Sequence, residues 1–403
     1  KRAYESSRRK IGGHTQKESF EMRVLHVSDL HAGKTLGRIN RNEDLYYALE
    51  QIINICKEER IDLLLIAGDI YDKSHPDHES QNLILDFLTK MHSVGIHTVL
   101  IAGNHDSYDF IKSYKNLKRI ARIHAFDRPC KNASDCIIKF GDLTVACLPY
   151  PSERVLTHID EHTQKSYTQK VAQYLNVLAK QVEGSRYTVL LAHLMVESAK
   201  VSGSERQSTV GEFYAVKPEH IPTGFDYVAL GHIHRHQKIN KTPVRVYYSG
   251  SPYQIDFSEK GTQKYVNLVV FEDEPTVKPI RLDLKRELHE VVISVKESFS
   301  TALESLKALK GLVKVILKTD IRDNTISIKK KHIEDILEDR LVKFEVEYEG
   351  ESASDKGHLS RDLDLLEAYK VYYKNTYGVE LPEELREEFI SVRWRAEHET
   401  HTS

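Results

Sequence analysis

The stretch Val24-Leu25-His26-Val27-Ser28-Asp29-Leu30-His31 joins a short apolar run to an Asp-x-His pair. Apolar runs of this length, bounded by glycine or polar residues, are typical of buried parallel strands. The carboxyl ends of such strands face the crevice of an open α/β sheet. Because side chains alternate along an extended strand, Asp29 and His31 are expected on one face. The stretch therefore predicts a strand that places two metal-binding side chains at one edge of a sheet.

The same arrangement, in which metal-binding residue types follow an apolar run, recurs four more times along the chain. The further segments are Gly68-Asp69 after 63–67, Gly103-Asn104-His105-Asp106 after 98–102, His193 after 189–192, and Gly231-His232-Ile233-His234 after 227–230. Each segment alone has an ordinary explanation, such as a turn that uses glycine and asparagine at positive φ, or a helix cap. Because five of them occur in order at predicted strand ends, we expect one common site.

The residue types in these segments suit two adjacent divalent metal ions. The candidate ligands combine carboxylates, one amide oxygen and imidazoles, and they are Asp29, His31, Asp69, Asn104, His193, His232 and His234. Such a mixed set suits manganese, iron or zinc better than calcium, which prefers oxygen alone. A carboxylate shared by two ions holds them roughly 3.5–4 Å apart, as in two-metal phosphoryl hydrolases. Asp69 is our candidate for that bridge.

Composition limits the class of protein without choosing its partner. The chain has 403 residues, a formal net charge of −2 and 29% charged residues, which predicts two or three compact units and no strongly basic balance. We see no apolar run near the roughly 20 residues that span a bilayer. The cysteines at 56, 130, 136 and 147 show no CxxC spacing, so we expect reduced thiols in a cytoplasmic protein with no membrane partner.

Periodicity and composition predict an α/β protein made of several parts. Helical spacing of apolar residues predicts amphipathic helices over 45–56 and 83–91, which would cover a sheet. The predicted parts are an N-terminal extension or tag (1–21), a catalytic domain (22–284), a small α/β lobe (285–349), a polar linker (350–359) and a helical segment (360–403). The small lobe is expected to run strand, helix, strand, helix, strand.

The helical segment after the linker has two apolar stripes. They consist of Leu365, Leu366, Tyr369, Tyr372 and Tyr373, followed by Leu385 and Phe389. The stripes could pack on the chain's own core, or they could form a partner site of the helix-in-groove kind. The polar linker favours the second interpretation, because helices tethered beyond a linker have little nearby core to cover. Both alternatives stay open.

Taken in order, the five segments resemble the motifs of the calcineurin-like metallophosphoesterases. Within that superfamily, residues 26–33, 229–235 and 248–252 are most similar to the SbcD-type nuclease subunits of bacterial double-strand-break repair complexes. The resemblance covers residues 22–284 and extends to the remainder in layout only. It implies a layered β-sandwich flanked by helices, with a small α/β capping lobe for DNA and C-terminal helices.

The resemblance also implies how the metal ligands are shared. It implies two Mn²⁺ ions, with Mg²⁺, Fe²⁺ or Zn²⁺ as alternatives. The first ion would be held by Asp29, His31, Asp69 and His234. The second ion would be held by Asp69, Asn104, His193 and His232. His105 becomes the catalytic histidine. Asp72 stands where some relatives carry a histidine, and we hypothesise that it orients His105, as in phosphatase-type relatives. A helix-capping carboxylate is the alternative for Asp72.

The implied activity is manganese-dependent cleavage of DNA, as a 3′ to 5′ exonuclease on duplex ends and an endonuclease on single strands. The implied partners are DNA and an SbcC-type coiled-coil ATPase, with a homodimer inside a heterotetramer. Basic residues that could contact phosphates are Lys112, Lys115, Lys118, Arg119 and Arg235, with 329–331 as a further group. Solvated helix faces are the alternative for these residues. The competing functions are a small-molecule or phosphoprotein metallophosphoesterase, and a scaffold without catalytic activity.

Overall fold

The computed structural model describes residues 21–159, 166–205, 215–294, 298–320 and 325–348, and short pieces between 369 and 389. The predicted N-terminal extension, apart from residue 21, and the predicted linker lie outside the described residues. Within the described part of the chain, no helix combines the length and the apolar character that a membrane span needs.

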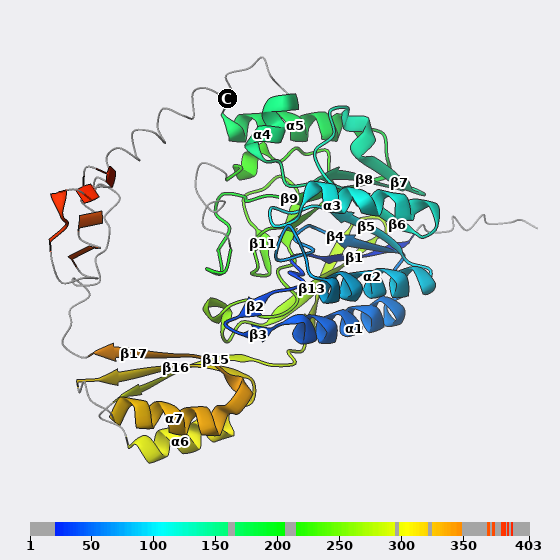
Figure 1. The fold of residues 1–403 in the computed structure, drawn as a ribbon. Coiled ribbons are helices and arrows are strands. Elements are labelled where there is room, and N and C mark those ends of the chain that lie inside the picture. Colours follow the sequence, from blue (N-terminus) through cyan, green and yellow to red (C-terminus); the bar gives the residue numbers. More distant parts are fainter. Residues whose placement is uncertain are drawn as a thin grey trace, which may run out of the picture.

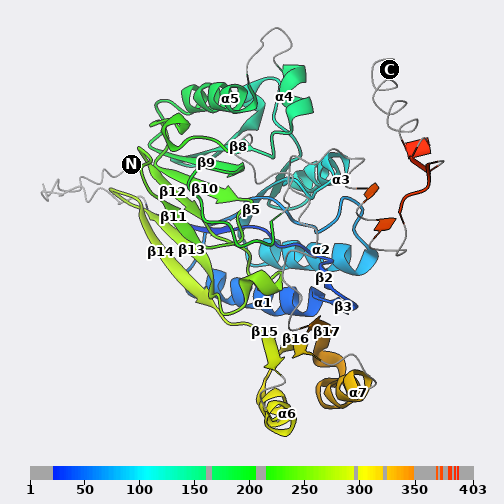
Figure 2. The same cartoon turned by 90° about the vertical axis from the view of Figure 1, so that its left-hand side faces the viewer.

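Two six-stranded sheets pack face to face at the centre of the molecule (Figures 1 and 2). The first sheet has the order β14 (Thr276–Leu282), β13 (Lys264–Phe271), β1 (Met22–Val27), β4 (Leu63–Ile66), β5 (His97–Ile101) and β6 (Ile123–Phe126). The second has the order β11 (Gln237–Ile239), β12 (Arg245–Tyr248), β10 (Tyr227–Gly231), β9 (Tyr187–His193), β8 (Leu143–Leu148) and β7 (Ile137–Phe140). β1, β4, β5 and β6 are mutually parallel, as are β8, β9, β10 and β12.

The alternation of side chains along each strand builds two cores from one sequence run. In β4, Leu63 and Leu65 face the second sheet, whereas Leu64 and Ile66 face the helices on the outer side. Because both faces are covered, the strand is apolar at every position and has no polar alternation. The predicted buried parallel strands are confirmed.

Helices cover the outer face of each sheet, which gives four layers (Figure 1). On the first sheet lie α1 (Asn42–Glu58), α2 (His78–Ser93) and α3 (Tyr108–Ser113), and on the second lie α4 (Glu153–Ile159) and α5 (Tyr167–Gln181). The predicted stripe of α1, from Leu45 to Cys56, is buried against the sheet. The predicted layered β-sandwich flanked by helices is confirmed.

A separate three-stranded sheet follows the sandwich (Figure 1). It consists of the parallel strands β15 (Leu288–Ser294), β16 (Leu312–Thr319) and β17 (Leu341–Tyr348), with α6 (Phe299–Ala308) and α7 (Thr325–Leu337) packed on it. The expected order of elements is confirmed. The lysines at 329–331 lie within α7. The domain boundaries stay a prediction.

The small sheet meets the sandwich through a cluster beside the hairpin of β2 (Thr35–Leu36) and β3 (Ile39–Asn40). Leu36 packs there with Leu288 and Leu312. The short 3₁₀ helix η5 (Phe257–Glu259) adds Phe257 to the same cluster. The lobe thus contacts the β2–β3 hairpin and η5.

The cysteine prediction is wrong for one pair. Cys130 and Cys136 form a disulfide, with their Cα atoms 5.9 Å apart, whereas Cys56 and Cys147 are free and buried as expected. The 3₁₀ helix η2 (Ala133–Cys136) turns the chain back between the two residues, and a spacing outside the CxxC type gave no sign of this turn.

His26 generates a testable pH dependence. It lies between the two sheets, where Nδ1 is 2.9 Å from the hydroxyl of Tyr227 and Nε2 is 3.1 Å from the carbonyl of Leu230. Burial lowers the pKa of His26 to about 3. The unfolded chain therefore binds the extra proton first as pH falls below the ordinary histidine value, and stability is lost toward acid.

We expect the His26 contribution to the free energy of unfolding to fall by about 2 kcal/mol between pH 7 and pH 5. Urea unfolding in the presence of a chelator, on the wild type and on His26→Gln, measures it. The free energy of unfolding of His26→Gln should fall by about 2 kcal/mol less than that of the wild type between pH 7 and pH 5. An identical pH dependence in both proteins would contradict the assignment.

Candidate metal centre

The predicted ligands converge at the carboxyl ends of five strands from both sheets. Asp29 and His31 follow β1, Asp69 follows β4, and His193 is the last residue of β9. Asn104 follows β5, and His232 and His234 follow β10. The side chains of Asp29, His31, Asp69, His193, His232 and His234 are all buried. One site at the junction of the two sheets therefore collects residues more than 200 positions apart in the sequence.

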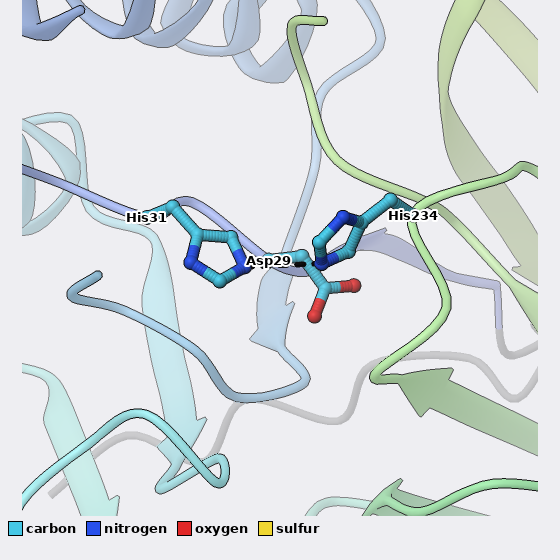
Figure 3. A group of neighbouring side chains, drawn as sticks. All are labelled: Asp29, His31 and His234. Carbon is cyan, nitrogen blue, oxygen red and sulfur yellow. Dashed lines mark hydrogen bonds between the residues drawn. The ribbon is translucent and has the colours of Figure 1, made fainter. Parts of the chain in front are cut away.

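The first group consists of Asp29, His31 and His234, whose ligand atoms lie within 4.8 Å of one another (Figure 3). Nε2 of His31 is 3.1 Å from Nε2 of His234, and the carboxylate of Asp29 lies beside both rings. Two imidazole nitrogens and a carboxylate that point at one position form a donor set that fits a divalent cation.

The second group lies around His193. Its Nε2 is 2.9 Å from Oδ1 of Asn104, and the same oxygen is 2.9 Å from Nδ1 of His232. Asp69 completes the group, with Oδ2 3.5 Å from Nε2 of His193. The set of two imidazoles, an amide oxygen and a carboxylate again suits a divalent transition metal.

Asp69 lies between the two groups. Its Oδ2 is 3.7 Å from Nε2 of His31 on one side and 3.5 Å from Nε2 of His193 on the other. Asp29 also has an oxygen near both groups. Burial alone would disfavour the charged forms, yet attraction between the partners raises the pKa of His193 to about 9 and holds the pKa of Asp69 well below its usual range. The position supports the predicted bridge, and the share of each ligand stays a prediction.

Several of these residues have a backbone conformation that side chains rarely adopt. φ is 54° at Asp29, 45° at His31, 49° at Asp69 and 104° at His232. Such conformations cost on the order of 1–3 kcal/mol each and persist where the surroundings hold them. The turn alternative for Gly103-Asn104 is wrong in its geometry, because neither residue has positive φ.

Glycine is required beside the ligands for close approach. A Cβ at Gly103 would lie 2.1 Å from Oδ1 of Asp69, and one at Gly231 would lie 1.9 Å from the carbonyl oxygen of Ala67. Both positions are therefore closed to any larger residue. The sequence pattern contains these glycines, but only the structure shows that they leave room for Asp69 and for the carbonyl group of Ala67.

Asp72 lies close to His105 and also to His31. Nδ1 of His105 lies 2.8 Å from the main-chain carbonyl oxygen of Asp72. The carboxylate of Asp72 lies 3.3 Å from Nδ1 of His31 and 3.2 Å from Nζ of Lys34. Ligand atoms of Asp72, His31 and His105 all lie within 4.8 Å of one another, so the carboxylate is close to both rings. The catalytic roles of His105 and Asp72 stay predictions.

Asp106 has contacts that the motif did not predict. Its buried carboxylate accepts hydrogen bonds from the main-chain N–H groups of Gly103 (2.8 Å), Tyr71 (2.9 Å) and Ile70 (3.1 Å). Burial and the nearby Asp69 raise the pKa of Asp106 to about 6. Asp106 therefore ties the loop after β4 to the loop after β5.

The candidate DNA contacts lie on exposed parts of the sandwich. Lys112 is on α3, and Lys115, Lys118 and Arg119 are on the following 3₁₀ helix η1 (Tyr114–Arg119). Lys115 is paired with Asp127 at 2.5 Å. Arg235 is exposed and directly follows His234. Residues 329–331 lie on α7 of the small lobe, away from α3 (Figures 1 and 2).

Only part of the candidate partner segment can be placed. Leu365, Leu366 and Tyr372 lie outside the described residues. The ring of Tyr369 stacks on Phe389 at 4.7 Å between centroids and is 6.3 Å from the ring of Tyr373. Leu385 is half-buried. The two predicted stripes are therefore in contact with each other, and the choice between core and partner site stays open.

Asp106→Asn should destabilise the protein by about 1–3 kcal/mol, because the amide nitrogen would face N–H groups that now donate to a carboxylate. Thermal unfolding of the metal-free chain measures the effect. Asp109→Asn is the matched control, since Asp109 forms an exposed pair with Arg128. Equal stability of Asp106→Asn and the control would contradict the tie between the two loops.

Comparisons with known proteins agree with this geometry. The family model described as calcineurin-like phosphoesterase matches residues 22–236. The SbcD subunit of the nuclease SbcCD from Bacillus subtilis (strain 168) is 32% identical over 257 residues, which is 62% of this chain and 66% of that protein, just under two thirds of its length.

Two solved structures are similar at 10% identity. A Thermus thermophilus protein has a TM-score of 0.38 and covers 64% of this chain and 99% of its own. A dimetal phosphatase from Danio rerio has a TM-score of 0.40, and the match covers 64% of this chain and 98% of that protein. Because the family model matches more than half of the sequence and includes all the predicted ligands, this protein belongs to the calcineurin-like phosphoesterase family.

Proposed function

We propose that this protein is the metal-dependent DNA nuclease subunit of an SbcCD-type repair complex, acting as a 3′ to 5′ exonuclease on duplex ends and an endonuclease on single strands. The observation that carries the proposal is the convergence of both donor groups, with Asp69 between them. The similarity to the SbcD subunit of the nuclease SbcCD supports DNA as the substrate. Mn²⁺ is the proposed ion, with Mg²⁺, Fe²⁺ and Zn²⁺ as alternatives.

The residues of the site fit two divalent ions and would hold them as the two donor groups. The chemistry supplied by such a pair is activation of a water and polarisation of phosphoryl oxygens at neutral pH. Asp29, His31 and His234 would hold one ion, and Asn104, His193 and His232 the other. Asp69 would be shared.

His105 is the proposed catalytic histidine. Its Nδ1 can donate to the main-chain carbonyl of Asp72 at 2.8 Å, and this hydrogen bond fixes the orientation of the ring. The main-chain N–H of His105 donates to Oδ1 of Asp69 at 2.9 Å, which holds the residue against the donor groups. A histidine in this place can stabilise charge on the phosphoryl oxygens or protonate the leaving oxygen.

The proposed DNA surface is the basic stretch on α3 and η1 together with Arg235. Lys112, Lys118 and Arg119 are exposed on the element that directly follows the loop of His105. Contacts of this kind bind phosphates without reading sequence. They suit an enzyme that degrades DNA ends of any sequence.

The proposed partner is an SbcC-type coiled-coil ATPase, which would bind the helical segment after the linker. The name of the Bacillus subtilis relative, a subunit of SbcCD, supports this partner. The aromatic contact of Tyr369 with Phe389 supports a helical unit that presents one surface. A homodimer within a heterotetramer and a cytoplasmic location complete the proposal.

The nuclease proposal is tested with end-labelled linear duplex DNA in the presence of Mn²⁺, with and without the ATPase partner. We expect shortening from the 3′ end, and we expect His105→Asn to lower the rate by about 10²–10⁴-fold, the usual share of a proton-transfer residue. Metal content by mass spectrometry should remain that of the wild type.

Loss of the metals in His105→Asn would instead identify His105 as a ligand. Hydrolysis of p-nitrophenyl phosphoesters without cleavage of DNA would favour a small-molecule or phosphoprotein phosphoesterase. Metal binding without either activity would favour a scaffold.

The proposed DNA surface predicts a change in salt dependence. Replacing Lys112, Lys118 and Arg119 with glutamine should weaken DNA binding and make the slope of log affinity against log salt shallower by about 0.9 per lost phosphate contact. Fluorescence anisotropy with a labelled duplex measures both. The matched control is Lys57→Gln/Lys139→Gln/Lys180→Gln, three exposed lysines on α1, β7 and α5 that are not candidate DNA contacts. An equal effect of the control would contradict the proposed surface.

A further inference from the structure

The metal-ligand candidate His234 is held at its main chain on both sides. Its N–H donates to Oε1 of Glu205 at 3.1 Å. Its carbonyl oxygen accepts from the N–H of Ser251 at 3.2 Å and from Nζ of Lys264 at 3.3 Å. The backbone of this one histidine is therefore fixed by three different segments.

The ring of His234 is held as well, on the side away from the donor group. Nδ1 is 2.6 Å from the hydroxyl of Ser204 and 3.3 Å from Oε1 of Glu259. Ser204 in turn donates to the same carboxylate oxygen of Glu259. Nε2 of His234 is thus the ring nitrogen that faces Asp29 and His31. It lies 3.1 Å from Nε2 of His31.

Glu259 is an unusual residue to find behind this ring, because its side chain is completely buried. Its charge is balanced by Lys264, which is also buried and forms an ion pair with Oε2. Lys264 donates to Ser251 at 2.8 Å, and the N–H of Ile255 donates to Oε2 of Glu259 at 3.2 Å. A buried ion pair is costly to desolvate and adds little net stability over an apolar pair of similar volume.

The partners of Glu259 determine how it can act on the ring. Its ion pair with the ammonium group of Lys264 and the hydrogen bond from the N–H of Ile255 both suit a carboxylate. A carboxylate only accepts hydrogen bonds, so a proton must sit on Nδ1 for this contact to be favourable. With the proton on Nδ1, the lone pair of Nε2 points into the donor group.

We propose that Glu259, held in place by Lys264, is a positioning residue that fixes the ring and the tautomer of His234 for metal binding. The inference rests on the metal centre of the proposed function and adds a residue from outside the five motifs. His31 has a comparable arrangement, since its Nδ1 lies 3.3 Å from the carboxylate of Asp72. His193 differs, because its Nδ1 lies 2.7 Å from the main-chain carbonyl of Ala67, where no side chain can be exchanged.

The test is calorimetric titration of the metal-free full chain with Mn²⁺. Two neutral variants separate the hydrogen bond from the charge: Glu259→Gln/Lys264→Met keeps an acceptor for Nδ1, and Glu259→Leu/Lys264→Met removes it. Partners of this kind are typically worth 10–100-fold in metal affinity. We expect such a loss at one of two Mn²⁺ sites in the leucine variant and a smaller loss in the glutamine variant.

The matched control is Asp226→Asn. Asp226 directly precedes β10, at the end of the strand opposite to the metal centre, and its carboxylate accepts hydrogen bonds from N and Oγ1 of Thr188 at 2.7 and 2.9 Å. This control should bind Mn²⁺ as the wild type does. Thermal unfolding with a chelator compares the folds of all variants, and the glutamine variant decides the question if the leucine variant does not fold.

Wild-type affinity at both sites in the folded leucine variant would overturn the inference, as would wild-type affinity in the glutamine variant where only that one folds. An equal loss in the Asp226→Asn control would also overturn it. A wild-type chain that binds none of Mn²⁺, Mg²⁺, Fe²⁺ and Zn²⁺ would overturn the proposed function instead, so the two failures are distinguishable.

Discussion

The constraint on which the structure depends is the burial of several carboxylates and imidazoles at one junction of two sheets. Charged groups removed from water are costly unless they are paired or bind a cation. Asp69 illustrates this, since its Oδ2 lies within 3.7 Å of imidazoles from two different donor groups. The apolar core between the sheets brings these groups together, and a pair of bound cations would balance their charge.

Close approach of the ligand loops is achieved at the cost of local strain. Asp29, His31 and Asp69 each have positive φ, and hydrogen bonds between their loops hold them there. The N–H of Asp29 donates to the carbonyl of Gly68, and the N–H of His31 donates to the carbonyl of Asp69, both at 3.0 Å. The loops after β1 and β4 therefore support each other, and Asp106 adds the loop after β5. Strain of this kind persists where the surrounding fold determines the conformation.

The sequence predicted most of this arrangement, and its failures have a common cause. Short continuous apolar runs and helical stripes predicted the strands and helices, because each depends on near neighbours in the chain. The Cys130–Cys136 disulfide depends on where the folded chain places the turn at η2. Glu259 lies 25 positions after His234 in no recognised motif, so its contact with that ring could be found only in three dimensions.

The segment that carries Glu259 also explains how the small lobe and the metal centre are joined. In η5, Phe257 packs with Leu288 in the cluster at the base of the lobe, while Glu259, two residues later, contacts His234. Lys260 then forms an ion pair with Glu290 of β15. Residues 257–260 therefore contact the small lobe on one side and a metal-ligand candidate on the other, so one short segment of the chain serves both.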